Sequence, residues 1–103
     1  MAVEKLELLI LKILALGAQH GYGIGQRIEQ ISGGALRVTL GSLYPALQRL
    51  EKSGLIDAEW KASDNNRRAR YYRITAEGRR RLAADQKEWD RVAAAMARIL
   101  KAT

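Results

Sequence analysis

Hydrophobic residues recur at helical spacing in four stretches of this chain, over residues 4–16, 22–31, 39–53 and 76–100. The first stretch is apolar on almost every side of the helix it would form, with Leu6, Leu9 and Ile13 among its many aliphatic residues. A helix of this kind must be covered on several sides. We therefore expect it to be central to the fold and expect a second subunit to cover one of its sides.

The next two helices have recognisable ends. Residues 19–21 are predicted to form a turn after the first helix, and Ser32 with two glycines ends the second. Thr39 is a suitable N-cap for the third helix, and Gly54 suits the position just beyond its C-terminus. Leu43, Leu47 and Leu50 then form one apolar stripe along the third helix.

Two shorter stretches alternate in the manner of strands. Residues 55–61 place Ile56, Ala58 and Trp60 on one face, and residues 70–74 are rich in strand-forming residues. Residues 62–68 between them form a polar loop with turn-forming residues. This pattern predicts a β-hairpin with a basic tip and a basic second strand.

The last helix is predicted to start after Thr75 and to carry a narrow apolar seam. Leu82, Trp89 and Met96 lie seven residues apart, and Val92 and Ile99 fill the intermediate position of the heptad. Because the chain offers no other free helix, we expect this seam to pair with the same helix, or with the first helix, of a second subunit. The predicted dimer interface comprises Leu6, Leu9, Ile13, Leu82, Trp89, Val92, Met96 and Ile99.

Charge is concentrated in one part of the chain. The 103 residues carry a net charge of +7, and residues 67–81 hold seven arginines against one glutamate. A dense block of this kind indicates contact with a polyanion, and the guanidinium fork matches phosphate oxygens better than an ammonium does. A solvated, solubilising face is the alternative explanation of the charge alone.

The order of elements favours a polyanion contact over a solvated face as the explanation of the arginine block. Three helices followed by a hairpin form the plan of a winged helix-turn-helix, in which the third helix enters the DNA major groove and the hairpin contacts an adjacent part of the duplex. We predict a mainly α fold with a small β-hairpin, divided into a DNA-binding domain over residues 1–75 and a C-terminal dimerisation helix over residues 76–103. The arginine block then falls on this hairpin, which is called the wing, and at the start of the last helix. Element order and charge position therefore agree on double-stranded DNA as a partner.

Several short motifs support a more specific interpretation. The segments that carry it are His20-Gly21-Tyr22 with Ile24, Gly41-Ser42-Leu43-Tyr44-Pro45-Ala46-Leu47, Arg49-Leu50-Glu51 with Gly54-Leu55-Ile56, and Arg67-Arg68-Ala69-Arg70-Tyr71-Tyr72-Arg73-Ile74-Thr75 with Gly78. In this order and spacing the chain resembles the PadR family of bacterial transcriptional regulators, and its single C-terminal helix resembles that of the smaller PadR subfamily. The resemblance implies a homodimer that binds a palindromic operator and represses transcription, with the C-terminal helix exchanged onto the first helix of the partner.

The predicted DNA contacts follow from this plan. On the third helix they are Thr39, Ser42, Tyr44 and Arg49, and on the wing Arg67, Arg68 and Arg70. Two of these residues have alternative roles: Tyr44 as a packing residue, and Arg49 as an ion-pair partner of Glu29 or Glu51. Tyr22 and Tyr72 are expected to pack in the core or against the wing.

The resemblance also implies an effector site. Some members of the smaller subfamily bind flat aromatic or cationic molecules at the dimer interface, stacked on a tryptophan of the C-terminal helix, and Trp89 occupies the matching place. An indole ring suits aromatic and cationic ligands, and Asp85, one turn earlier, could attract a cation. A planar aromatic small molecule is therefore a candidate partner, and the alternative is that Trp89 only fills the interface.

The sequence gives little support to the other classes of protein, such as enzymes, metal-binding proteins and membrane proteins. The chain has no cysteine and one histidine, which excludes thiolate chemistry and argues against a metal site, and no catalytic constellation or cofactor-binding motif stands out. We expect neither an enzyme nor a membrane protein, and we expect a cytoplasmic location because no signal peptide is recognisable. A dimeric protein-interaction module without specific DNA binding stays open as an alternative, as does a DNA-binding regulator without an effector.

Overall fold

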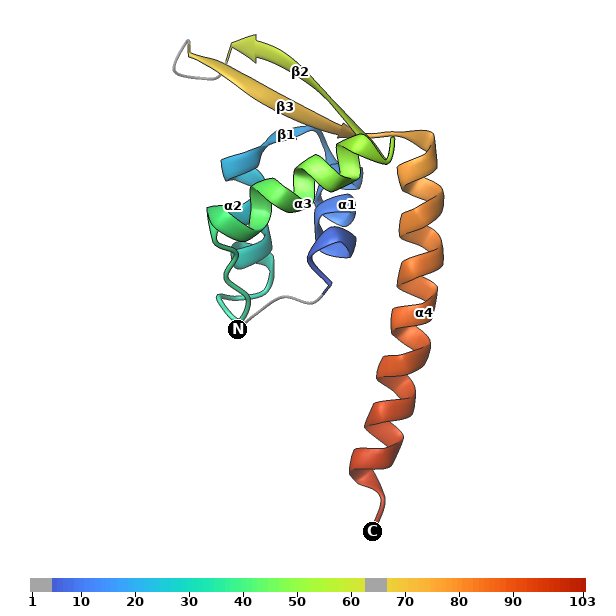
Figure 1. Cartoon of the computed structure of the whole chain (residues 1–103). Coiled ribbons are helices and arrows are strands. Elements are labelled where there is room, and N and C mark those ends of the chain that lie inside the picture. The colour runs from blue at the N-terminus through green and yellow to red at the C-terminus, as the bar shows by residue number, and fades with distance from the viewer. Residues whose placement is uncertain (1–4, 63–66) are drawn as a thin grey trace.

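The computed structural model describes residues 5–62 and 67–103 and contains four helices and a small sheet (Figure 1). The elements in chain order are α1 (Leu6–Leu16), β1 (Gln19–His20), α2 (Gly21–Ile31), α3 (Leu40–Lys52), β2 (Ile56–Ala62), β3 (Arg68–Ile74) and α4 (Ala76–Lys101). All four predicted helices and both predicted strands are present. Glu4, the predicted first residue of the first helix, and residues 63–66 of the hairpin loop lie outside the described residues.

The apolar helix α1 is the centre of the core. It contacts α2, α3, β3 and α4, and Ile10 and Leu11 are completely buried. The prediction that α4 finds no helix to pair with in its own chain is wrong for the first turns of α4, because these turns pack on α1. The amphipathic pattern could not reveal this contact, since it does not state which helix covers which.

The segment between α1 and α2 differs from the predicted turn. Gln19 and His20 form a two-residue strand whose register places them opposite Tyr72 and Tyr71 of β3. The Nδ1 atom of His20 then accepts a hydrogen bond from the backbone N–H of Gly23 at 3.0 Å, which caps the start of α2. A strand of two residues is too short to produce an alternating pattern, and its pairing with β3 connects residues far apart in the sequence.

Helix α3 begins and ends as the sequence indicates. The Thr39 side chain accepts a hydrogen bond from the Ser42 N–H, and Gly54 adopts a φ of +75° just beyond the C-terminus. Gly54 allows the chain to reverse and places the Leu55 N–H on the Leu50 carbonyl at 3.0 Å. The chain therefore turns directly from the end of α3 into the hairpin.

The hairpin is longer than the sequence predicts. Strands β2 and β3 pair antiparallel from Ile56 opposite Ile74 to Ala62 opposite Arg68, so β3 starts two residues earlier than expected. β3 lies between β1 and β2 in the sheet. Side chains near the base of the hairpin pack on α3 and the core, and the outer end extends away from the helices (Figure 1).

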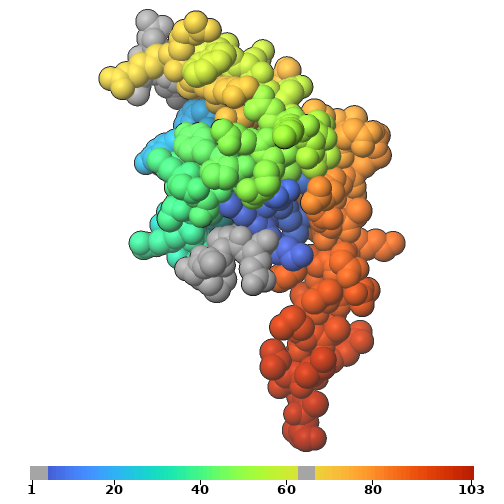
Figure 2. Space-filling model, viewed as in Figure 1, coloured from blue at the N-terminus to red at the C-terminus, as the bar shows by residue number. Residues whose placement is uncertain are grey.

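Helix α4 leaves the rest of the chain after its first turns. Thr75 caps its N-terminus, Leu82 is buried against the core, and the second half projects as an isolated rod (Figures 1 and 2). The molecule is consequently 58 Å long and only 28 by 21 Å across. None of the helices in the described part of the chain is both long and apolar enough to cross a membrane.

Candidate nucleic-acid interface

The hairpin lies next to α3: β2 contacts α3, and Arg70 of β3 pairs with Glu51 of α3. The buried stripe of α3 consists of Leu43, Ala46, Leu47 and Leu50. At 100° per residue, the positions opposite that stripe are the exposed residues Gly41, Pro45, Gln48 and Lys52. These four residues were not among the predicted contacts. The stripe predicted from the sequence was the signal that could have identified them, because they lie opposite it on the helical wheel.

The two hydroxyl residues at the start of α3 lie together and are exposed. Besides accepting from the Ser42 N–H at 3.2 Å, the Thr39 hydroxyl donates to the Ser42 hydroxyl at 3.1 Å. The Thr39 side chain is therefore committed to the cap. Ser42 retains its own proton and can donate it outward.

The tyrosines near α3 divide between packing and exposure. Tyr44 is 43% exposed, yet its ring lies against Gly21, where an added Cβ would come within 3.0 Å of the ring. Tyr72 is buried as predicted, and this burial raises the pKa of its phenol, against the opposing effect of nearby Arg70. Tyr22 does not pack in the core: it is 58% exposed on α2.

Arg49 lies on the flank of α3 that faces α1. Its Nε atom pairs with an Oε atom of Glu7 at 3.2 Å, so it pairs with neither of the two glutamates that the sequence suggested. Those glutamates have other partners: Glu29 pairs with Arg37, and Glu51 pairs with Arg70. The Arg49 side chain is 60% exposed, and its two terminal amino groups remain as donors while its Nε atom stays on Glu7.

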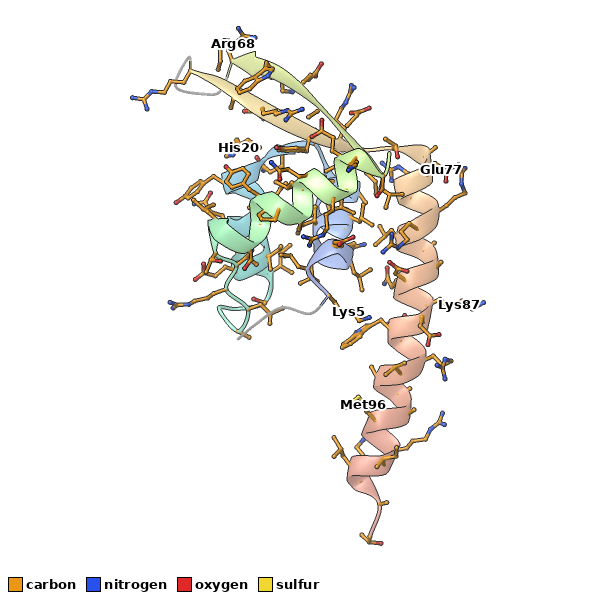
Figure 3. All side chains as sticks on the ribbon, in the orientation of Figure 1. Lys5, His20, Arg68, Glu77, Lys87 and Met96 are labelled. Carbon is orange, nitrogen blue, oxygen red and sulfur yellow. The ribbon has the colours of Figure 1, made fainter. Side chains whose placement is uncertain are left out.

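The wing arginines differ in how strongly they are held. The register of the hairpin puts Arg68 and Arg70 on the face that is turned toward α3, and Arg70 pairs with Glu51 of α3 at 2.5 Å. The Arg68 guanidinium lies 5.8 Å from the centre of the Trp60 ring. Figure 3 shows Arg68 at the outer end of the hairpin. Within residues 5–62 and 67–103, neither Arg67 nor Arg68 has an acidic partner within 4.0 Å.

Three of the four remaining arginines of the basic block, Arg73, Arg80 and Arg81, have acidic neighbours. Arg73, on the opposite face of the hairpin, pairs with Asp57 at 3.0 Å, and this hydrogen bond raises the pKa of the Arg73 guanidinium. Arg80 pairs with Glu77, and Arg81 pairs with Asp85 at 2.7 Å. Among the described residues, the arginines of this block without an acidic partner are therefore Arg67 and Arg68 at the outer end of the wing and Arg79 at the start of α4.

The predicted dimer residues fall into two groups. Leu6, Ile13 and Leu82 are buried within the single chain, and Leu9 and Val92 are half-buried. The surface still open to a partner lies on the projecting part of α4, where Figure 3 shows Met96. Its exposed members are Trp89, Met96, Ile99 and Leu100. Leu100 was not predicted, although it lies five full turns after Leu82 and so points in the same direction.

Asp85 lies one turn before Trp89 on the same side of α4. Its carboxylate accepts a hydrogen bond from the Nε atom of Arg81 at 2.7 Å. This pairing reduces the negative charge that Asp85 can present to a cation. Trp89 itself is 46% exposed.

The sequence and the fold match known proteins closely. The model of the transcriptional regulator PadR-like family matches residues 10–84. A solved transcriptional regulator from Clostridium thermocellum is 29% identical, with a TM-score of 0.85 and 94% of each chain covered. A PadR-like regulator from Bacillus cereus is also 29% identical, with a TM-score of 0.84 over 96% of this chain and 94% of its own.

A relative from Mycobacterium tuberculosis is described as a transcriptional regulator. It is 38% identical over 65 residues, which are 63% of this chain and 60% of that protein. An uncharacterised protein from Lysinibacillus sphaericus is 32% identical over 84% of this chain and 80% of its own length. The sequence motifs, the winged fold and these matches agree, and the chain belongs to the PadR-like family of transcriptional regulators.

Proposed function

We propose that this regulator is a homodimeric repressor that binds a palindromic operator and is released by a planar aromatic small molecule. The observation that carries the proposal is the shared surface of α3 and the wing. There the exposed side of a capped helix lies beside a wing whose outer end carries Arg67 and Arg68 (Figure 3), which have no acidic partners among the described residues. Such a surface combines a helix for base readout with guanidinium groups for phosphate.

The dimer part of the proposal is supported by the far half of α4. Trp89, Met96, Ile99 and Leu100 form an exposed apolar seam that its own chain does not cover. A seam with heptad spacing is stabilised by a second helix. Two-fold pairing would place two α3 helices on one side of the DNA, and half-sites about one helical turn apart, or a multiple of it, would then match the protein's symmetry.

The effector part of the proposal is centred on Trp89. In a symmetric dimer the two Trp89 rings approach the same axis, and a flat ligand could stack on them. Because Asp85 already pairs with Arg81, we expect stacking rather than charge to dominate recognition. Titration of the protein with planar aromatic dyes tests this: Trp89→Ala should abolish the change in dye fluorescence, while Trp60→Phe should retain it.

The decisive experiment is fluorescence anisotropy of the full chain on a labelled duplex from upstream of its own gene. A scrambled duplex of equal composition serves as the control, and both are measured at several salt concentrations. We expect salt-dependent binding that favours the upstream duplex and releases on addition of an active dye. Equal binding to both duplexes would contradict sequence-specific recognition of that region. Absence of binding at low salt would instead favour a protein-interaction module.

A further inference from the structure

Trp60 is a large apolar residue on the wing that is exposed to solvent, and no packing contact with the core accounts for its presence there. It is 60% exposed, although Ile56 on the same face of β2 is buried and Ala58 is half-buried. Alternation along the strand directs the ring toward the side of the sheet where α3 lies, but the ring is too far along the hairpin to reach the core. A large indole is thus held in solvent on the same side as the candidate DNA-binding helix.

The surroundings of Trp60 are cationic. Trp60 lies opposite Arg70 in the register, and the next pair on that face toward the tip is Ala62 opposite Arg68. The Arg68 guanidinium is 5.8 Å from the centre of the Trp60 ring, within the range of a cation–π contact. Arg70 is directed inward by Glu51 at 2.5 Å. The face therefore presents an aromatic plane between two guanidinium groups.

The opposite face of the same hairpin has a different character. Asp57 pairs with Arg73 there, and Lys61 lies 4.4 Å from the centre of the Tyr71 ring. On that face the aromatic residue is half-buried and held by its neighbours, including the edge of His20. Among the described residues of the hairpin, the ring that is largely exposed is Trp60, on the face turned toward α3.

We propose that Trp60 is a DNA-contacting residue whose indole packs against the deoxyribose edges of the groove that the wing enters, beside the phosphates bound by Arg68. This inference rests on the proposed DNA binding. Deoxyribose is the apolar part of the DNA backbone, and apolar side chains accompany arginine in proteins that bind the minor groove. Trp60 would add apolar contact area to the wing, while Arg68 would supply the charge.

A salt titration separates these two contributions. Trp60→Ala should weaken binding to the upstream duplex roughly tenfold, because a large apolar contact is lost. It should leave the slope of log affinity against log salt unchanged, because no phosphate contact is lost. Arg68→Ala should instead reduce that slope by roughly one. Lys61→Gln removes a cation–π contact from the other face, and it should weaken binding less than twofold at high salt.

A second measurement does not depend on how Trp60→Ala folds. In the Trp89→Phe background Trp60 is the only tryptophan, and its quenching by acrylamide reports its exposure. Saturating duplex should reduce that quenching severalfold. Unchanged quenching with DNA bound, or wild-type affinity of Trp60→Ala, would overturn the inference while leaving the proposed function intact. If the wild-type chain bound no duplex, the proposed function and this inference would both fail.

Discussion

At the scale of single residues, His20 shows how one side chain can connect three elements. It lies in β1 opposite Tyr71, its ring meets the Tyr71 ring edge-on at 5.5 Å, and its Nδ1 atom caps α2 through the Gly23 N–H. The sequence alone predicted only a turn at this position. The cap gives His20 a structural role, in which its Nδ1 atom is the hydrogen-bond acceptor.

Substitutions at His20 can separate the cap from the ring contact. His20→Asn keeps a good N-cap acceptor but loses the ring, whereas His20→Ala loses both. We expect His20→Ala to be less stable than His20→Asn by about 1 kcal/mol, the usual contribution of an N-cap. Urea unfolding of the two variants measures this difference. Equal stabilities would show that the 3.0 Å hydrogen bond contributes nothing.

Gly78 fixes the position of α4 against the base of the wing. A Cβ at this residue would lie 2.1 Å from the Leu55 carbonyl oxygen and 2.7 Å from Cγ1 of Ile74. Gly78→Ala must therefore move α4 or the wing, and we expect a loss of roughly 1–3 kcal/mol in the free energy of unfolding. Gly41→Ala is the matched control. That site is open and helical, so alanine there should be neutral or stabilising. Equal effects of the two substitutions would contradict the close contact.

At the scale of elements, the wing has two faces with different electrostatic roles. Arg68 and Arg70 lie on the face turned toward α3, and Arg73 lies on the other face and is paired with Asp57. Seven arginines in fifteen residues suggested one basic block. The register divides this block, because neighbouring residues of a strand point to opposite sides.

The combined substitution of Arg68→Ala and Arg70→Ala tests the face turned toward α3. We expect it to weaken binding to all duplexes by similar factors and to lower the salt slope by roughly one for each lost phosphate contact. Losing Arg70 also leaves Glu51 without its partner, which adds repulsion near the DNA. Arg73→Ala should change the slope little. An unchanged slope in the double variant would remove the wing from the mechanism.

The elements also show where sequence reasoning succeeds and where it stops. Caps and stripes are local, so Thr39, Gly54 and the Leu43–Leu50 stripe predicted the limits and the buried side of α3. The pairing of β1 with β3, the ion pair of Arg49 with Glu7 and the packing of α4 on α1 depend on residues far apart in the sequence. Such contacts follow from the assembled fold, and no periodic pattern indicates them.

At the scale of the whole molecule, the elongated shape arises because only the first part of α4 packs on its own chain. The first turns of this helix complete the core, and the remaining turns project with an apolar seam. Leu6, Ile13 and Leu82 are already buried, so they can contribute little further area to a dimer. The association of two chains should therefore depend most on the far half of α4.

Val92→Glu tests this dependence. A charge introduced into the seam should be desolvated on pairing, and we expect monomers or aggregates by light scattering after gel filtration. Ala94→Glu places the same charge on the opposite, exposed side of α4, and it should leave the dimer intact. A stable Val92→Glu dimer would contradict the proposed interface.

The junction at Leu55, Thr75 and Gly78 is a pivot, and α4 extends from it as a long lever arm whose far end moves when the helix tilts. The Thr75 hydroxyl donates to the Gly54 carbonyl at 2.8 Å, and its backbone N–H donates to the Leu55 carbonyl at 3.1 Å. The end of α3, the root of the wing and the start of α4 are therefore joined at one pivot. A helix of 26 residues is about 39 Å long, so a tilt of about 5° at the pivot moves its far end by about 3 Å. In the proposed dimer, the same geometry in reverse would convert a small displacement between the two α4 helices into a change in the angle at which each α3 meets its half of the DNA.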